Sequence, residues 1–138
     1  MKRVVVSGIG LVSALGCDKD SAFERLHVYK NAVVVRDDLA QIKGLNAHMV
    51  APVNGFVIPE HFTRKVLRTM GPVSVMAVWS AEQALEDAGL LNDEIITSGR
   101  TGVAYGSSFG SAGPVLDFYS MVKTHEVGPI NSSSYIKI

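Results

Sequence analysis

The chain has 138 residues, 47% of them hydrophobic, which is enough for one compact domain with a core. Its 13 basic and 13 acidic residues cancel, so no charge excess indicates a nucleic acid or an anionic membrane as partner. A single cysteine excludes an internal disulfide framework and a cysteine-based structural zinc site, and no apolar run reaches the roughly 18 residues of a membrane span. We therefore expect a protein of a reducing compartment, the cytoplasm.

The N-terminal segment is the first predicted element. Arg3–Ser7 is rich in β-branched residues, which is typical of a buried strand in the middle of a covered sheet. A cleaved signal peptide is the less favoured alternative, because Gly8, Gly10 and Ser13 interrupt the apolar stretch.

A strand that runs into Gly8-Ile9-Gly10 also suggests a dinucleotide-binding domain, with Asp37 as the ribose-binding acid. Two features count against this alternative. Ser13 occupies the place of the third glycine, and Asp37 lies beyond the expected separation of about 20 residues.

The next segments are predicted helices whose sequence signals differ in strength. One begins near Asp18, where Ser21 and Glu24 offer a capping box. From Val28 to Phe56 the periodicity is poor, which predicts an irregular excursion with one short helix near Asp38–Ile42. The basic segment Arg64–Arg68 is interpreted as a solvated helix face.

The best-defined helix has Gly71 at its cap and Pro72 at its first position, and it ends at Gly89. Small residues recur along it at helical spacing, at Ala77, Ser80, Ala81 and Ala84. Small side chains let another backbone approach closely, so we expect a central helix. Alanine is also the best helix former, which is the simpler explanation of the same stripe.

The last third begins with a helical turn over Asn92–Ile96 and a buried strand over Gly102–Tyr105. Glycines at 102, 106, 110 and 113 follow among small residues, with Phe109 as the one bulky group in the turn. Phe109 therefore either points into a pocket or fills the local core. An amphipathic helix over Pro114–His125 and a loop-like tail complete the chain.

Gly106–Gly110 matches the Gly-x-Ser-x-Gly pattern of a hydrolase nucleophile, with Ser108 as the serine. Only His125 follows it, and Asp117 lies on the same predicted helix, so a triad is hard to assemble.

The four histidines lack metal-ligand spacing, and Asp18 and Asp20 disfavour a reactive thiolate at Cys17. These observations predict no metal site and no cofactor.

Three blocks of sequence, in order, resemble the β-ketoacyl-acyl carrier protein synthases, the condensing enzymes of fatty-acid and polyketide assembly. Met1–Gly16 is similar to the family's opening strand and Gly-x-Gly turn. Ala81–Leu90 is similar to its alanine-rich central helix, and Thr101–Gly110 is similar to its Gly-Val-x-x-Gly-Ser strand and glycine turn.

The resemblance implies an α/β thiolase-like layered fold, built as two similar halves and paired into a homodimer. It implies that a cysteine accepts an acyl group from an acyl carrier protein and condenses it with a malonyl thioester after decarboxylation. In the family the nucleophilic cysteine lies downstream of the segment that ends here, and Cys17 cannot replace it. Residues 1–138 are therefore expected to be only the N-terminal part of the first half, inactive alone.

The resemblance also implies roles for particular residues. Phe109, with Ser108 beside it, is expected to bind substrate by lining the acyl-chain pocket, and Ser132–Ile136 is expected to approach the dimer interface. A non-catalytic fragment that pairs with itself or with a second chain is the alternative from a different class.

Overall fold

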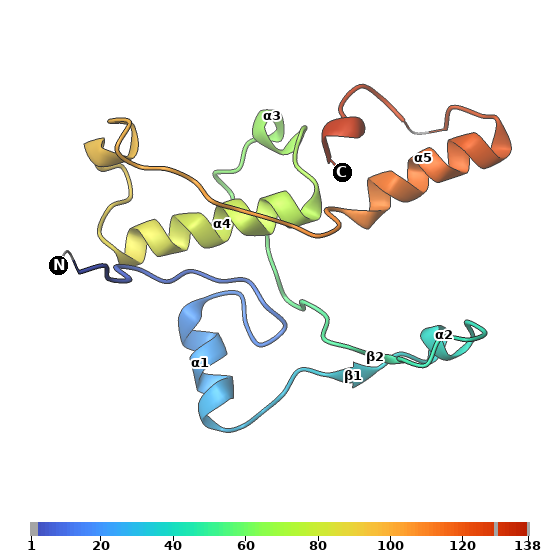
Figure 1. Ribbon diagram of the computed structural model, residues 1–138, viewed down its shortest axis with the longest axis horizontal. Helices are drawn as coiled ribbons and strands as arrows, with labels where there is room; N and C mark the ends of the chain where they lie inside the picture. The colour runs from blue at the N-terminus through green and yellow to red at the C-terminus, as the bar shows by residue number, and fades with distance from the viewer. Residues whose placement is uncertain (1–2, 129, 138) are drawn as a thin grey trace. The chain divides into compact units, whose positions relative to one another are not determined.

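Figure 1 shows the computed structural model, which describes residues 3–128 and 130–137. By their internal contacts the residues group into two compact units. One unit comprises the residues up to Val57 together with Ser80–Gly89. The other comprises Ile58–Trp79 and the residues from Leu90 onward. Helix α4, Pro72–Asp87, contributes its first half to the second unit and its last half to the first.

Helix α1, Lys19–His27, begins in the first unit where the sequence predicts it, but its cap is a different residue. The Asp18 carboxylate accepts a hydrogen bond of 2.8 Å from the Ser21 N–H. The predicted capping box of Ser21 and Glu24 is therefore wrong, because Asp18 has the extended backbone of an N-cap and Ser21 already lies inside the helix. Ala22 is buried on the inner side of α1.

The excursion after α1 holds more regular structure than its sequence predicts. Strands β1, Val34–Val35, and β2, Met49–Val50, pair antiparallel with Val34 opposite Val50. Helix α2, Asp37–Ala40, lies between them and confirms the short predicted helix. Strands of two residues are too short to show an alternating pattern, which is why the sequence did not reveal the ladder.

The second unit is mainly helical. Helix α3, Arg64–Leu67, is capped by Thr63 and exposed, as predicted for the basic segment. The helix expected from Pro72 and the turn expected at Asn92–Ile96 are confirmed as α4 and as η1, Glu94–Ile96. Helix α5, Ala112–Thr124, starts two residues before the predicted Pro114.

The tail also contains a short 3-10 helix, η2, Tyr135–Lys137, within a segment predicted as loop. Pro129 and Ile138 of that segment lie outside the described residues.

Two predicted strands are absent from the described part of the chain. Arg3–Ser7 and Gly102–Tyr105 carry no ladder, and Val4, Val6 and Val103 are 96%, 81% and 94% exposed. A strand needs a neighbour for its backbone N–H and C=O groups, however well its residues suit a sheet. The sequence pattern therefore identified residues suited to a sheet interior, but no paired strand forms there.

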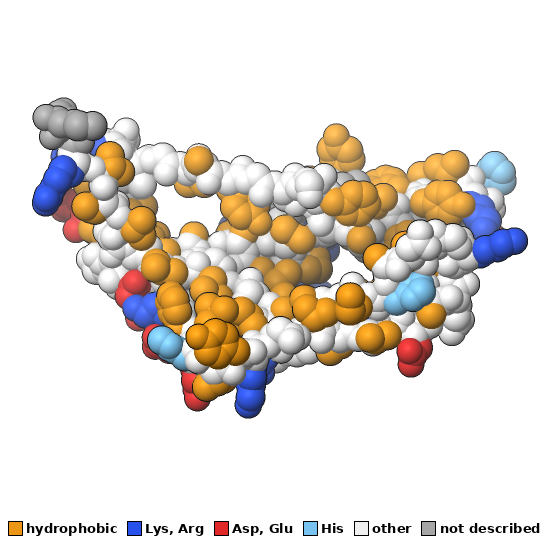
Figure 2. All heavy atoms as spheres, turned by 60° about the horizontal axis from the view of Figure 1, so that its bottom comes forward, with side chains coloured by type: hydrophobic (Ala, Val, Ile, Leu, Met, Phe, Trp, Pro, Cys, Tyr) orange, Lys and Arg blue, Asp and Glu red, His pale blue; other side chains and the backbone are white. Residues whose placement is uncertain are grey.

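Few apolar side chains are buried in either unit. Among the described residues the buried hydrophobic ones are Ala22, Phe62 and Val75, whereas many larger apolar side chains are exposed (Figure 2). Exposed apolar surface on this scale is typical of an interaction surface. In the described residues, no helix combines the length and apolarity needed to cross a bilayer.

Candidate functional site

The Gly8-Ile9-Gly10 segment lies directly against the last half of α4. A Cβ atom built on Gly8 would lie 2.1 Å from the Ala84 carbonyl oxygen, and one built on Gly10 would lie 2.0 Å from that of Ser80. Real Cβ atoms do not approach this closely, so only glycine fits at both positions. The stripe of small residues on α4 therefore does admit another backbone, as predicted.

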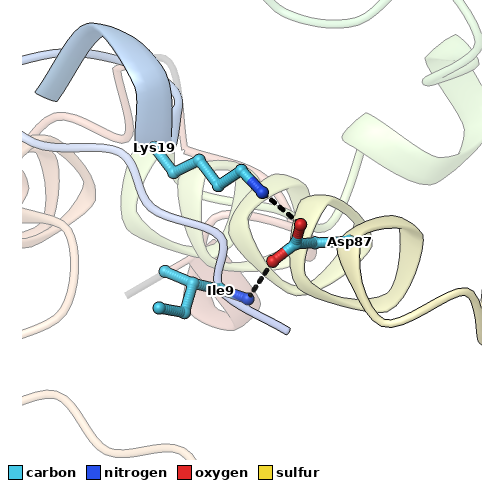
Figure 3. A network of polar contacts seen from close by, with 3 residues as sticks. All are labelled: Ile9, Lys19 and Asp87. Atoms are coloured by element: carbon cyan, nitrogen blue, oxygen red, sulfur yellow. Dashed lines mark hydrogen bonds and ion pairs between the residues drawn. The ribbon is translucent and has the colours of Figure 1, made fainter. Parts of the chain in front are cut away.

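Asp87, in the last turn of α4, fixes the same segment through its carboxylate (Figure 3). Its Oδ2 accepts a hydrogen bond of 2.9 Å from the Ile9 N–H, and its Oδ1 pairs with the Lys19 ammonium at the start of α1. The hydrogen bond from Lys19, then that from Ile9, holds the pKa of Asp87 below its ordinary value. The same bond from Lys19 to Asp87 raises the pKa of Lys19.

The turn after Gly10 is closed by its own backbone and by α4. Ser13 and Gly16 exchange main-chain hydrogen bonds of 2.8 and 3.3 Å, and Gln83 Nε2 donates a bond of 2.9 Å to the Cys17 carbonyl. The Cys17 thiol is half-buried and lies 3.7 Å from the Asn54 carbonyl oxygen that accepts its hydrogen bond. Cys17 thus occupies a structural place in the opening turn.

This packing explains the Gly-x-Gly pattern without a nucleotide. In a dinucleotide-binding fold the glycines let a pyrophosphate approach the backbone. Here the space beside Gly8 and Gly10 is filled by the main chain of α4. The glycines serve helix packing, and this favours the condensing-enzyme interpretation over the dinucleotide one.

The glycine turn that carries Phe109 and Ser108 lies in the second unit, just before α5. Ser107 Oγ accepts a hydrogen bond of 3.0 Å from the Gly110 N–H, and Gly110 has φ +73°. Phe109 is 66% exposed and Ser108 is exposed, whereas Ser111 is only 4% exposed. Phe109 therefore does not fill a core in this chain, and the turn presents it outward from a buried anchor.

The hydrolase alternative fails on distance. Ser108 precedes α5 and His125 forms its C-terminal cap, so the 13 residues of a helix, about 20 Å, separate them. Asp117 lies midway along the same helix. A nucleophile and its base must be within hydrogen-bond reach, so these three residues do not form a triad.

No group of three or more histidine, cysteine, aspartate or glutamate side chains among the described residues could hold a metal ion. The sequence also missed one feature of the site, the Asp87 network. A signal for it was present, because a carboxylate in the last turn of a helix is disfavoured by the helix dipole and needs another reason to be there.

Comparison with known proteins decides the family. Residues 1–136 match the model of the N-terminal domain of the β-ketoacyl synthases. The chain belongs to the β-ketoacyl synthase family.

A solved β-ketoacyl synthase from Burkholderia phymatum has the same fold. It is 42% identical, with a TM-score of 0.86, over 99% of this chain and 34% of its own. The α/β thiolase-like layered fold expected from the sequence is thereby confirmed, the chain forming an N-terminal part of it.

Curated relatives give the same result. A 3-oxoacyl-(acyl-carrier-protein) synthase 1 from Haemophilus influenzae is 32% identical over 81% of this chain and 27% of its own length. The enzyme of that name from Escherichia coli is 31% identical over 80% of this chain and 27% of its own. Nodulation protein E of a Rhizobium species is 33% identical over 81% of this chain and 26% of its own length. The chain thus spans about a quarter of the length of these relatives.

Proposed function

We propose that this chain is the N-terminal part of a β-ketoacyl-acyl carrier protein synthase, an acyltransferase of fatty-acid biosynthesis. The single observation that carries the proposal is the family match over residues 1–136, supported by relatives named 3-oxoacyl-(acyl-carrier-protein) synthase. The packing of Gly8 and Gly10 on α4 supports it further, since it gives the Gly-x-Gly pattern a role that needs no cofactor.

The reaction has two stages. A cysteine thiolate takes the acyl group from a carrier-protein thioester, and the carrier thiol leaves. Loss of CO₂ from a malonyl thioester then gives an enolate, which attacks the acyl carbonyl and releases the cysteine thiolate. The nucleophile and its histidines are proposed to lie outside these 138 residues, because Cys17 is held in the opening turn.

Phe109 and Ser108 are the proposed substrate-binding residues of this part of the enzyme. The exposure of Phe109, which is 66% in this chain, supports a role at the acyl chain, because the side chain is left available for a ligand. Tyr135 and Ile136 are also exposed, at 75% and 61%, which supports the proposal that the Ser132–Ile136 stretch faces a second copy in a homodimer. The cytoplasm is the proposed compartment.

The carrier protein needs a docking surface, and α3 has suitable charge for an anionic partner. Arg64, Lys65 and Arg68 are exposed within five residues of a chain with no net charge. A local cluster of cations attracts an anionic partner over a distance, so these side chains would steer an anionic carrier protein. We place the carrier at α3 on this ground.

The proposal is tested by a condensation assay on two proteins. The longest protein that the coding region specifies is compared with residues 1–138, using acyl-loaded and malonyl-loaded carrier protein and measuring CO₂ release and β-ketoacyl product. We expect product from the longer protein only, also when it carries Cys17→Ser. Acyl transfer to Cys17 in the 138-residue chain, abolished by Cys17→Ser, would overturn the placement of the nucleophile. Absence of product from an intact longer protein would overturn the proposed activity.

The alternative is a non-catalytic piece that pairs with itself or with another chain. It is favoured by the exposed apolar side chains, among them Val4, Val103 and Leu116. Both interpretations predict self-association or poor solubility of residues 1–138, so a well-behaved monomer in sedimentation at high concentration would count against both.

A further inference from the structure

Gly71, which is buried at the start of α4, makes close contacts that the proposed chemistry leaves unexplained. A Cβ atom built there would lie 2.3 Å from Ser111 Oγ, 2.9 Å from Ser111 Cβ and 2.3 Å from the Lys137 carbonyl oxygen. Its φ is not in the left-handed region, so the need for glycine comes from space alone.

Ser111 is the residue through which this contact reaches the substrate turn. It is 4% exposed, it is the N-cap position of α5, and its hydroxyl does not cap that helix. It follows directly on Gly110, whose left-handed backbone and hydrogen bond to Ser107 close the turn that holds Phe109. One end of the exposed turn is therefore fixed by the contact between Ser111 and Gly71.

We propose that Gly71 is a positioning residue for acyl-chain selection, acting through Ser111 on the turn that carries Phe109. The inference rests on the proposed function, in which Phe109 lines the acyl pocket. A methyl group at residue 71 would lie within 3 Å of both the Lys137 carbonyl oxygen and Ser111 Cβ, so these two residues must shift, and Phe109, which precedes Ser111 by two residues, is expected to move with it. The depth of the pocket then changes although no residue that touches substrate has been replaced.

The test uses the complete synthase with Gly71→Ala, and the readout is the ratio of kcat/KM for a long and a short acyl carrier substrate. Pocket changes of about one methylene alter such ratios by roughly tenfold, so we expect a change of about that size. Gly113→Ala is the matched control, because a Cβ there meets open space in α5 and the ratio should stay unchanged. Equal loss for both substrates, or an unchanged ratio, would overturn the proposal.

A second variant keeps the proposal testable if Gly71→Ala does not fold. Ser111→Gly removes the other side of the contact, so it should also change the ratio of kcat/KM for the long and the short substrate. An unchanged ratio in a folded Ser111→Gly enzyme would overturn the proposal equally. In the double variant the ratio should return only part of the way, since the Lys137 carbonyl still opposes the new methyl group. A wild-type enzyme without condensing activity would instead reject the proposed function, and Phe109→Ala with an unchanged ratio would reject the pocket assignment.

Discussion

Asp87 and Ile9 lie 78 residues apart in sequence, and the Asp87 carboxylate accepts a hydrogen bond of 2.9 Å from the main-chain N–H of Ile9. Because Lys19 binds the second oxygen of the same carboxylate, one side chain joins the opening segment, α1 and α4. The N-terminal Gly-x-Gly turn is therefore held by charge as well as by close packing.

Asp87→Asn should lower stability at neutral pH and change its pH dependence. The pKa of Asp87 is depressed in the folded protein, so its contribution is present above the unfolded value of about 3.9 and is lost as pH falls through the folded value. Urea unfolding should give a larger unfolding free energy for wild type than for Asp87→Asn at pH 7, and this difference should shrink as pH falls below about 3.9.

Asp117→Asn, at an exposed position of α5, is the control for Asp87→Asn and should leave the unfolding free energy at pH 7 nearly unchanged. Added salt should reduce the difference in unfolding free energy between wild type and Asp87→Asn at pH 7, because Lys19 and Asp87 are both partly exposed and their attraction is screened. A gap that persists unchanged at pH 3 would show that the charge on Asp87 is not what stabilises the turn.

Gly10→Ala should be strongly destabilising. Its new methyl group would meet the Ser80 carbonyl oxygen and the Ala84 nitrogen, which belong to the rigid backbone of α4. Overpacking of this kind costs about 1–3 kcal/mol, and thermal unfolding measures it. Gly102→Ala, which meets open space, should cost far less; equal losses for the two would contradict the packing argument.

The same contact predicts that the chain does not bind a nicotinamide dinucleotide. Because α4 occupies the space beside Gly8 and Gly10, titration with NAD or NADP should show no saturable binding. Binding near micromolar concentration that disappears in Gly10→Val would revive the oxidoreductase interpretation.

Asp18→Ala should destabilise α1 by about 1 kcal/mol, the usual effect of losing an N-cap. The hydrogen bond from the Ser21 N–H also depresses the pKa of Asp18, so the loss should be present at pH 7 and smaller in acid. Glu24→Ala is the discriminating comparison in denaturant unfolding. It should have little effect, whereas a cost as large as that of Asp18→Ala would restore the capping box.

Phe109→Ala in the complete synthase should admit longer acyl chains, seen as a rise in kcat/KM for a long relative to a short substrate. In residues 1–138 the ring is 66% exposed, so Phe109→Ala in this chain alone should lower the melting temperature much less than the loss of about 3–5 kcal/mol for a buried phenylalanine would imply. Tyr105→Ala, a comparably exposed aromatic at 65%, should leave the selectivity unchanged. Equal slowing of both substrates would make Phe109 part of a core rather than of the pocket.

The sequence predicted the helices well and the sheet poorly, for a physical reason. Pro72 and Asp18 give local signals, since a cap or a fixed φ acts within a few residues. Val4–Val6 and Val103 carry an equally clear preference, but a strand forms only beside a partner, which no local pattern supplies.

The candidate site was predicted in the same uneven way. The glycine turn around Phe109 is visible in composition, and the three matching blocks revealed the family. The contacts Gly71–Ser111 and Ile9–Asp87 join distant positions through one carbonyl, hydroxyl or carboxylate each, and such pairs leave no periodic trace in one sequence.

The contacts of Gly8 and Gly10 are made mostly with main-chain atoms of α4, and this gives the two sides of the junction unequal tolerance to change. The helix must only avoid bulk beside its carbonyl groups, so more than one small residue at 80 and 84 satisfies this contact, although glycine there weakens the helix itself. The turn has no such freedom, because any side chain at residue 8 or 10 collides with backbone. A saturation scan of this junction would therefore show two positions restricted to a single amino acid facing two that accept a small set.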